Sequence, residues 1–258
     1  MLIIFALCTL SFGLTFEKGQ LYYIPQKVDS NGTVTFNYSD YSESMEFYKA
    51  VSIENFNPFR QGSSEYDKSF CIFLLDQFAN YKTNTPLTET EFSCEGVQSA
   101  YTSLLYGLYG YAVGFYESRD VSPSITGLIR ASANRVEFKD VPDDKKEIAE
   151  FTDYDIPLSC KGTAYSQTFY GLENYGLVDA QCISNTIIPT DLSKCSNGSA
   201  TMPYLTGYTM GLFEKGDANT MKKAILRFGP VLNTQDNILY IGWETGTNNK
   251  EQWVIVQG

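Results

Sequence analysis

The cysteines constrain the fold of this chain more than any other feature. Beyond residue 15 the sequence holds five of them, at Cys71, Cys94, Cys160, Cys182 and Cys195. In an oxidising compartment, an odd set of this size indicates two disulfides and one leftover thiol. We expect the leftover to be a buried, inert sulfur, because the sequence SFCIF around Cys71 contains no group that would activate a thiol.

The first residues indicate which compartment the chain enters. Residues 1–15 carry no charged side chain, and the apolar run LIIFALCTL is followed by small residues at Gly13 and Thr15. This pattern predicts a signal peptide over 1–15 that is cleaved near Thr15. A membrane anchor is the alternative, but it needs about 20 apolar residues. We therefore expect a protein of the secretory pathway, extracellular or lysosomal (vacuolar), and not an integral membrane protein.

Charge and sequons limit the partners and modifications of the chain. The net charge of −11 argues against a nucleic-acid partner, because a polyanion would be repelled. Sequons at Asn31, Asn37 and Asn197 predict N-glycosylation. Zinc sites draw heavily on histidine, which is absent from the 258 residues, and no run has the regular acidic spacing of a calcium loop. We expect no metal and no cofactor.

Local patterns divide the chain into an N-terminal segment and a main domain. Residues 16–66 are polar and irregular, with one alternating run at 33–36, and are interpreted as an N-terminal extension or a pro-segment. Apolar residues at helical spacing predict one long buried helix from Ala100 to Phe115. A second helix is predicted over 164–175, ended by Gly176.

The C-terminal part gives the clearest local signals. Asp217 can cap a helix whose inward stripe ends at Phe228, and Gly229-Pro230 stops it. Two apolar runs, 238–243 and 253–256, then predict an antiparallel hairpin. Helices that precede strands indicate an α+β domain over residues 67–258.

Four segments in this order resemble the papain family (C1) of cysteine peptidases, in particular its cathepsin-B-like branch. The first opens a helix after a cysteine, and the second joins a cysteine-glycine turn to a helix and a further cysteine. The third is a helix before a Gly-Pro-Val strand, and the fourth is a pair of strands that each carry a tryptophan. Their sequences are SCEGV at 93–97, CKG at 160–162 with LENYGLV at 172–178 and Cys182, MKKAI at 221–225 with FGPV at 228–231, and IGW at 241–243 with EQWV at 251–254.

The resemblance implies a two-lobed fold, with a helical left lobe and a β-rich right lobe. The right lobe looks shortened, because Asp236 follows Val231 almost at once where the family inserts several strands, and because the family's Ser-Trp-Gly continuation does not follow Gln257. The resemblance also implies a disulfide between Cys94 and Cys160. Cys182 and Cys195 are then expected to form the second bridge.

Carried over position by position, the resemblance implies a peptidase site whose reactive residues are replaced by residues that cannot do their chemistry. The nucleophile position falls on Val97, and the position of the base falls on Asp236. The position of the orienting asparagine falls on Gln257, and that of the oxyanion-stabilising glutamine falls on Glu91. Valine cannot ionise, a carboxylate would repel an oxyanion, and the sequence offers no imidazole to activate a thiol.

The sequence leaves three functions open. The first is a catalytically inactive papain-like homologue that binds peptides or a peptidase through the residual cleft. The second is an active cysteine-type endopeptidase with an atypical site, or one that uses a hydroxyl such as Ser93 or Ser99 with a carboxylate or lysine base. The third is a structural secreted or surface glycoprotein that uses the scaffold only for stability. An unrelated secreted α+β domain is the remaining alternative.

Overall fold

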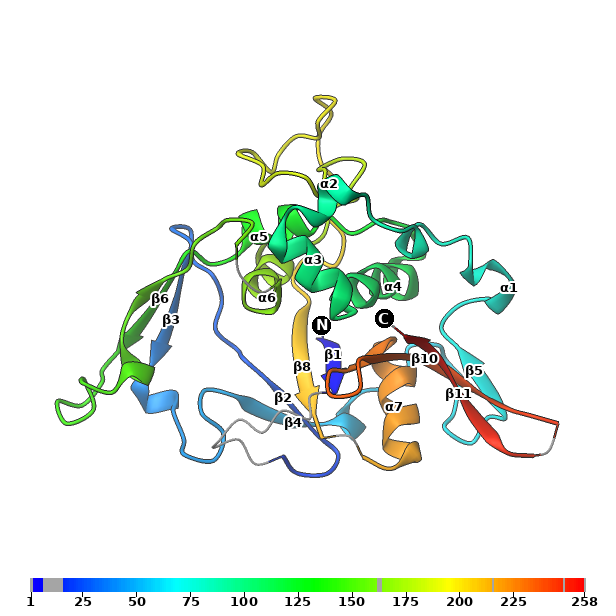
Figure 1. The fold of residues 1–258 in the computed structure, drawn as a ribbon. Helices are drawn as coiled ribbons and strands as arrows, with labels where there is room; N and C mark the ends of the chain where they lie inside the picture. The colour runs from blue at the N-terminus through cyan, green and yellow to red at the C-terminus, as the bar shows by residue number, and fades with distance from the viewer. Residues whose placement is uncertain (1, 7–15, 162–163, 215, 248, 258) are drawn as a thin grey trace.

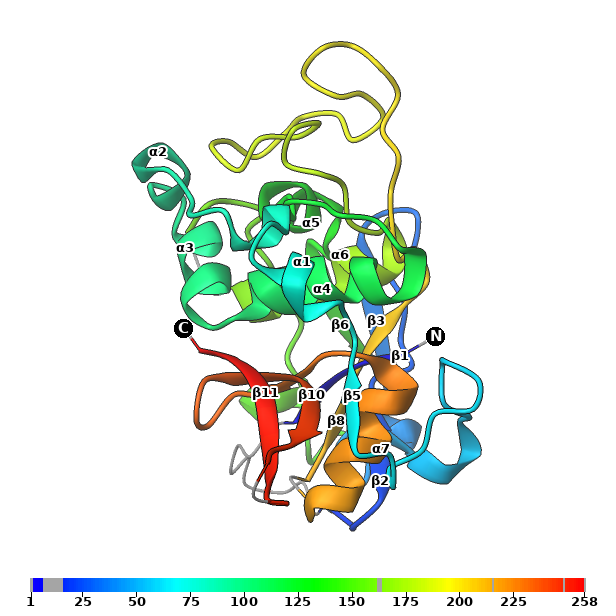
Figure 2. The same cartoon turned by 90° about the vertical axis from the view of Figure 1, so that its right-hand side faces the viewer.

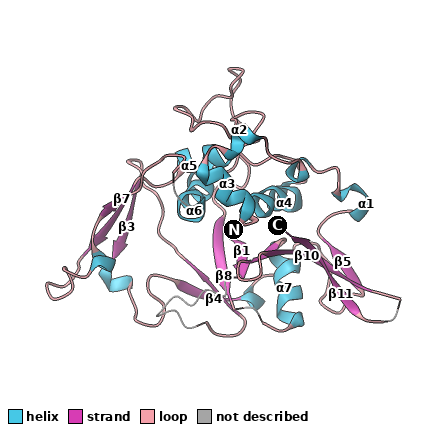
Figure 3. Ribbon diagram, viewed as in Figure 1, coloured by secondary structure: helices cyan, strands magenta, loops and turns pink. Residues whose placement is uncertain are grey.

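The chain forms a layer of helices above a large sheet, with a smaller sheet beside both (Figure 1). The computed structural model describes residues 2–6, 16–161, 164–214, 216–247 and 249–257. Figure 3 shows helices and strands in largely separate regions, and the predicted α+β class is confirmed at this level. The predicted order of helices before strands within 67–258 is wrong, because a strand at 69–71 precedes the first helix and another at 135–139 lies between two helices.

The large sheet joins strands from both ends of the chain. Its strands are β1 Leu2–Ala6, β2 Gln20–Tyr23, β4 Lys49–Ser52, β5 Ser69–Cys71, β8 Thr209–Phe213, β9 Val231–Asn233, β10 Ile238–Thr245 and β11 Glu251–Gln257. Over the described residues their order is β11-β10-β9-β1-β8-β2-β4, and β5 also pairs with β10. Strand β1 is parallel to both of its neighbours, β8 and β9, whereas the other pairings in this sheet are antiparallel.

The small sheet covers an aromatic cluster of its own. It consists of β3 Thr33–Asn37, β6 Arg135–Lys139 and β7 Tyr154–Asp155, in the order β3-β6-β7. Strand β3 confirms the predicted alternation, since Val34 and Phe36 are buried and their neighbours are not. Phe36 packs against Phe47 and Phe138, so residues brought from both sides of the predicted boundary at 66 share one core.

The helical layer lies over one face of the large sheet, and the last helix runs along the strands (Figure 2). The helices are α1 Leu75–Phe78, α2 Glu89–Phe92, α3 Glu95–Thr102, α4 Leu105–Glu117, α5 Ile125–Ala131, α6 Ala164–Asn174 and α7 Ala218–Phe228. Short 3-10 turns occupy 38–40, 53–55, 82–84 and 149–151. The main core lies between helices and sheet, and fully buried large residues such as Tyr109 and Trp243 belong to it.

One predicted helix is divided in two. The single helix expected from Ala100 to Phe115 is broken at Leu104, whose φ of 61° is left-handed. Helix α3 ends just before this residue and α4 begins just after it. The apolar spacing continues across the break because both helices bury a face, so periodicity could not show the change of direction.

The other local predictions are confirmed. Helix α6 ends at Asn174, and Gly176 follows in a positive-φ conformation. The Asp217 side chain caps α7 by accepting a bond from the Thr220 N–H at 2.9 Å, and Gly229 at φ 79° ends the helix. Strands β10 and β11 form the expected antiparallel hairpin.

The predicted leader and extension both contribute strands. Strand β1 lies inside the predicted signal peptide, while Met1 and residues 7–15, including the predicted cleavage at Thr15, lie outside the described residues. Residues 16–66 supply β2 and β4 to the large sheet and β3 to the small one. No helix in the described part of the chain has the length and apolar content to cross a bilayer.

Candidate functional site

The start of α3 is anchored by a disulfide. Cys94, which is 1% exposed, occupies the N-cap position of the helix and is bonded to Cys160. The Gly96 N–H donates to the Cys160 carbonyl at 2.9 Å, so the bridge and a backbone hydrogen bond hold the first turn together. The bridge between Cys94 and Cys160 is confirmed, and so is the one between Cys182 and Cys195.

Val97 occupies the first turn of this anchored helix. Its side chain is fully buried, with 0% exposure, within the main core. A nucleophile at the start of a helix benefits from the positive end of the helix dipole and from access to substrate. Val97 has neither an ionisable atom nor contact with solvent, so this position packs the core and cannot react.

Glu91 belongs to the short helix before α3 and forms its cap. The Glu91 carboxylate accepts bonds from the Thr88 N–H at 2.9 Å and from the Thr88 hydroxyl at 2.8 Å, and the Thr88 hydroxyl accepts from the Glu91 N–H. This reciprocal arrangement is a capping box. The carboxylate is therefore used to start α2, and it carries no N–H that could stabilise an oxyanion.

The structure brings Asp236 and Gln257 to one end of the hairpin. Gln257 lies on β11 opposite Ile238, two residues after Asp236. Both side chains are exposed, and Asp236 accepts a bond from the Asn233 amide at 2.6 Å. An exposed carboxylate and amide can bind polar groups, but neither supplies a base suited to neutral pH.

The hairpin end contacts the far end of α3. The Asn237 amide donates to the Thr102 carbonyl at 3.0 Å, and Thr102 is the last residue of the helix. Val97 lies in the first turn of the same helix. The structure thus places two predicted positions beside the C-terminal end of α3 and leaves Val97 and Glu91 at its N-terminal end.

The other side chains that could act as a nucleophile are hydrogen-bonded, partly buried or protonated. The Ser93 hydroxyl donates to the Thr90 carbonyl at 2.7 Å, which ties it to the end of α2. Ser99 is half-buried inside α3. Cys71 forms no disulfide, and burial raises the pKa of its thiol despite the opposing charge of Arg60. A raised pKa reduces the thiolate fraction, so Cys71 is a poor nucleophile at neutral pH.

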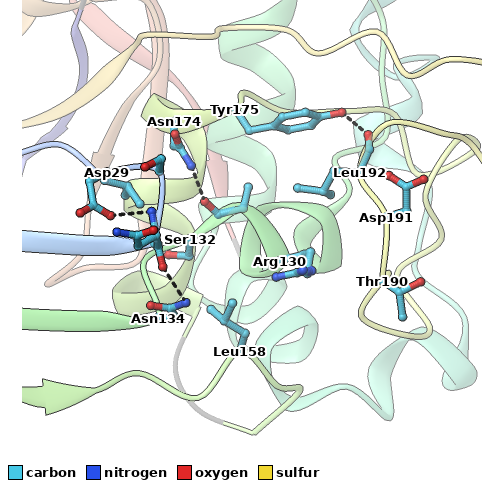
Figure 4. A pocket seen from close by; sticks show the side chains of 15 residues that line it. Asp29, Arg130, Ser132, Asn134, Leu158, Asn174, Tyr175, Thr190, Asp191 and Leu192 are labelled. Carbon is cyan, nitrogen blue, oxygen red and sulfur yellow. Dashed lines mark hydrogen bonds between the residues drawn. The ribbon is translucent and has the colours of Figure 1, made fainter.

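A separate pocket of about 550 Å³ opens between α5, the end of α6 and the loop residues 28–32, 132–134, 158 and 190–192. Figure 4 shows Arg130 from α5, Asn174 and Tyr175 from the end of α6, and Asp29 and Asp191 from the loops. None of the four positions carried over from the peptidase family lines it. The sequence gave no signal that the loop at 28–32 would meet segments about a hundred or more residues away.

Most polar groups of this pocket hold its walls together. The Asn174 amide donates to the Ala131 carbonyl at 3.2 Å, and the Tyr175 hydroxyl donates to the Leu192 carbonyl. Backbone N–H groups of Thr33 and Asn31 lower the pKa of Asp29, and that of Ser193 lowers the pKa of Asp191. Both carboxylates are therefore ionised, and their negative charge opposes an anionic ligand.

The predicted glycosylation sites are all accessible. Asn31, Asn37 and Asn197 are exposed, and Asn31 also lines the pocket. Over the residues described, no group of three or more His, Cys, Asp or Glu side chains is arranged to hold a metal ion. The accessible groups at the hairpin end and in the pocket are hydrogen-bonding side chains, which can bind a polar ligand.

Comparison of the chain with known proteins matched no family model, no curated protein and no solved structure.

Proposed function

We propose that the protein is a catalytically inactive, secreted or endolysosomal homologue of the papain-like cysteine peptidases that binds an extended peptide or a peptidase. One observation carries the proposal. The helix that follows the bridged Cys94 has the fully buried Val97 at the position where the resemblance expects the nucleophile. A valine inside the core keeps the helix in place and removes the reaction.

The fold supports the proposal in part of its detail. We assign helices α3 to α6 to the helical left lobe that the resemblance implies, and α7 with β8 to β11 to the right lobe. The Cys94–Cys160 bridge joins the two segments that the resemblance pairs. The β9–β10 turn is only four residues long, at 234–237, which fits a shortened right lobe.

Binding without catalysis follows from the groups that remain. Peptides are held largely through backbone hydrogen bonds and shape, and neither requires a nucleophile. The large sheet and the exposed hairpin end at Asp236 and Gln257 offer such contacts. The engaged Ser93 hydroxyl and the raised pKa of Cys71 give an atypical active peptidase less support.

The proposal is tested by an assay for peptide hydrolysis. Protein secreted from cells that express the full chain would be incubated with a mixed peptide library from pH 4 to 8, with and without a thiol-directed covalent inhibitor. We expect every peptide to remain intact under all conditions. The matched variant Cys71→Ser should behave identically, because Cys71 is outside the predicted site. Hydrolysis that both the inhibitor and Cys71→Ser abolish would contradict the proposal.

The exposed sequons favour a second candidate function, that of a structural surface glycoprotein. All three acceptor asparagines lie on the surface, where glycans can be attached without disturbing the core. Affinity capture from the secretory compartment separates the two functions. Recovery of a defined peptide or peptidase supports the binder, whereas recovery of membrane or wall material supports the coat protein.

A further inference from the structure

Strand β1 fills a position between two strands that do not pair with each other. Over the described residues, β8 and β9 each pair with β1 and are separated by it. The register joins Leu2 through Ala6 to Thr209 through Phe213, and it joins Phe5 and Ala6 to Leu232 and Asn233. Both neighbours are interior strands, because every residue of β8 and β9 is buried.

The same residues belong to the segment that the sequence predicts to be removed. Cleavage near Thr15 would take β1 from the processed protein and leave one edge of β8 and one edge of β9 without a partner. A buried backbone N–H or C=O without a partner costs about 1–3 kcal/mol. Several such groups along two buried strands make the vacated position a strong acceptor for another strand.

The surrounding elements limit how far the position can close by itself. Strand β8 is held on its other side by β2, through Tyr22 and Leu212. Strand β9 is held by the β10 hairpin and by the main core. Helix α7 connects β8 to β9 and packs on the same sheet, with Ile225 fully buried. The two edges are therefore fixed by separate neighbours.

The present occupant shows what chemistry the position accepts. Its sequence, LIIFA, is entirely apolar, and it runs parallel to β8. Gly211 lies opposite its third residue, Ile4, in this register. A segment of about five apolar residues in an extended conformation satisfies both backbone edges and suits this interior position.

We propose that the position between β8 and β9 is a strand-acceptor site, which in the processed protein binds an extended apolar segment of another polypeptide parallel to β8. This inference rests on the proposed function, since it specifies the peptide that a non-catalytic homologue would hold. The ligand class is an apolar peptide recognised through its backbone by strand addition.

The test uses protein secreted from cells that express the full chain. Intact mass first defines its N-terminus, which we expect to lie near residue 16. A labelled peptide of sequence LIIFA with two lysines on each side is then titrated by fluorescence anisotropy. We expect saturable binding and increased hydrogen-exchange protection of the amides at 209–213.

The matched control is the same peptide N-methylated at the positions that correspond to Ile4 and Phe5. Because neighbouring residues of a strand direct their amides to opposite edges, one methyl group faces each neighbouring strand. We expect binding to weaken by about tenfold or more, the loss that corresponds to one or more missing hydrogen bonds. The lysines are common to both peptides, so attraction to the acidic protein cancels in the comparison.

Three results would overturn the inference. Secreted protein that retains residues 1–6 would show that its own strand fills the site permanently. Processed protein that fails to bind the peptide, or that binds the N-methylated peptide equally well, would show that the edges close or that binding is non-specific. Hydrolysis of the peptide would instead contradict the proposed function, so failure of the two proposals can be distinguished.

Discussion

The helical layer and the large sheet are held together in different ways. In the helical layer, the Cys94–Cys160 bridge links the start of α3 to a segment far along the chain. The buried face of α3 also packs in the main core. The large sheet has no bridge among its described strands and joins segments from both ends of the chain. The comparison indicates that the layer nearest the predicted nucleophile is the more tightly constrained, although no reacting side chain remains there.

The largest effect is expected from removing the bridge of the helical layer. The double variant Cys94→Ala with Cys160→Ala opens a connection across a sequence separation of 66 and should lower the free energy of unfolding by about 4 kcal/mol. The control, Cys182→Ala with Cys195→Ala, opens a separation of 13 and should cost about 3 kcal/mol. Urea denaturation without reductant measures both. A larger loss of unfolding free energy on removal of Cys182–Cys195 than on removal of Cys94–Cys160 would show that the bridge at α3 is not the stronger constraint.

The next effect concerns the contact between α7 and the edge of the sheet. The Lys222 ammonium is nearly buried, pairs with the Glu251 carboxylate and lies 5.0 Å from the centre of the Trp243 ring. Glu251→Ala would leave this charge without its partner and should lower the free energy of unfolding by about 2 kcal/mol, below the range for fully buried pairs because water reaches Glu251.

The matched control for this pair is Gln252→Ala, an exposed position on the same strand. We expect it to change the free energy of unfolding by about 0.5 kcal/mol or less. Equal effects of the two variants in urea denaturation would show that the ion pair does not fasten the sheet to α7.

A smaller effect is expected at the cap of α5, within the helical layer. The fully buried Ser124 hydroxyl accepts a bond from the Gly127 N–H at 3.1 Å. Ser124→Ala removes this acceptor and should lower the free energy of unfolding by about 1 kcal/mol. Thermal denaturation of Ser124→Ala and Ser124→Thr measures the effect, and the threonine variant should recover part of the loss. An unchanged melting temperature for Ser124→Ala would refute the role of the cap.

The smallest effect depends on pH and tests whether residues 16–66 belong to the fold. Burial, followed by the charge of Glu150, raises the pKa of Glu46. A carboxyl group with a raised pKa in the folded state favours folding at low pH, and this contribution is lost as pH rises through that pKa. Glu46→Gln should therefore raise the melting temperature at pH 7 and leave it unchanged near pH 4.

Glu43→Gln is the control for this pH effect, because Glu43 is exposed on the same loop. It should leave the melting temperature unchanged at both pH values. If Glu46→Gln has no effect at pH 7, the loop does not unfold together with the rest of the protein, and residues 16–66 behave as a separate extension.

The sequence predicted the elements whose signals are local. Helix α7 was predictable because its cap at Asp217, its inward stripe and its stop at Gly229 lie within a few residues of one another. The break at Leu104 was not predictable, since a left-handed leucine carries no mark in an apolar pattern. The pairing of β2 with β8 joins segments more than 150 residues apart, which no local pattern specifies.

The candidate sites show the same difference between features that a local pattern predicts and features that depend on distant segments. The positions of Val97 and Glu91 followed from motifs close to Cys94, and their inability to support catalysis was evident from their residue types. The burial of Val97 and the capping bonds of Glu91 required the structure. The pocket beside Arg130 is assembled from distant loops and helix ends, so its lining could not be inferred from spacing.

The papain resemblance implies that a bridge between Cys94 and Cys160 anchors α3. Mass mapping of disulfides in the secreted, unreduced protein tests this most directly. We predict one linked peptide that contains Cys94 and Cys160, a second that contains Cys182 and Cys195, and Cys71 as a free thiol. A link between Cys71 and Cys94 would contradict the account.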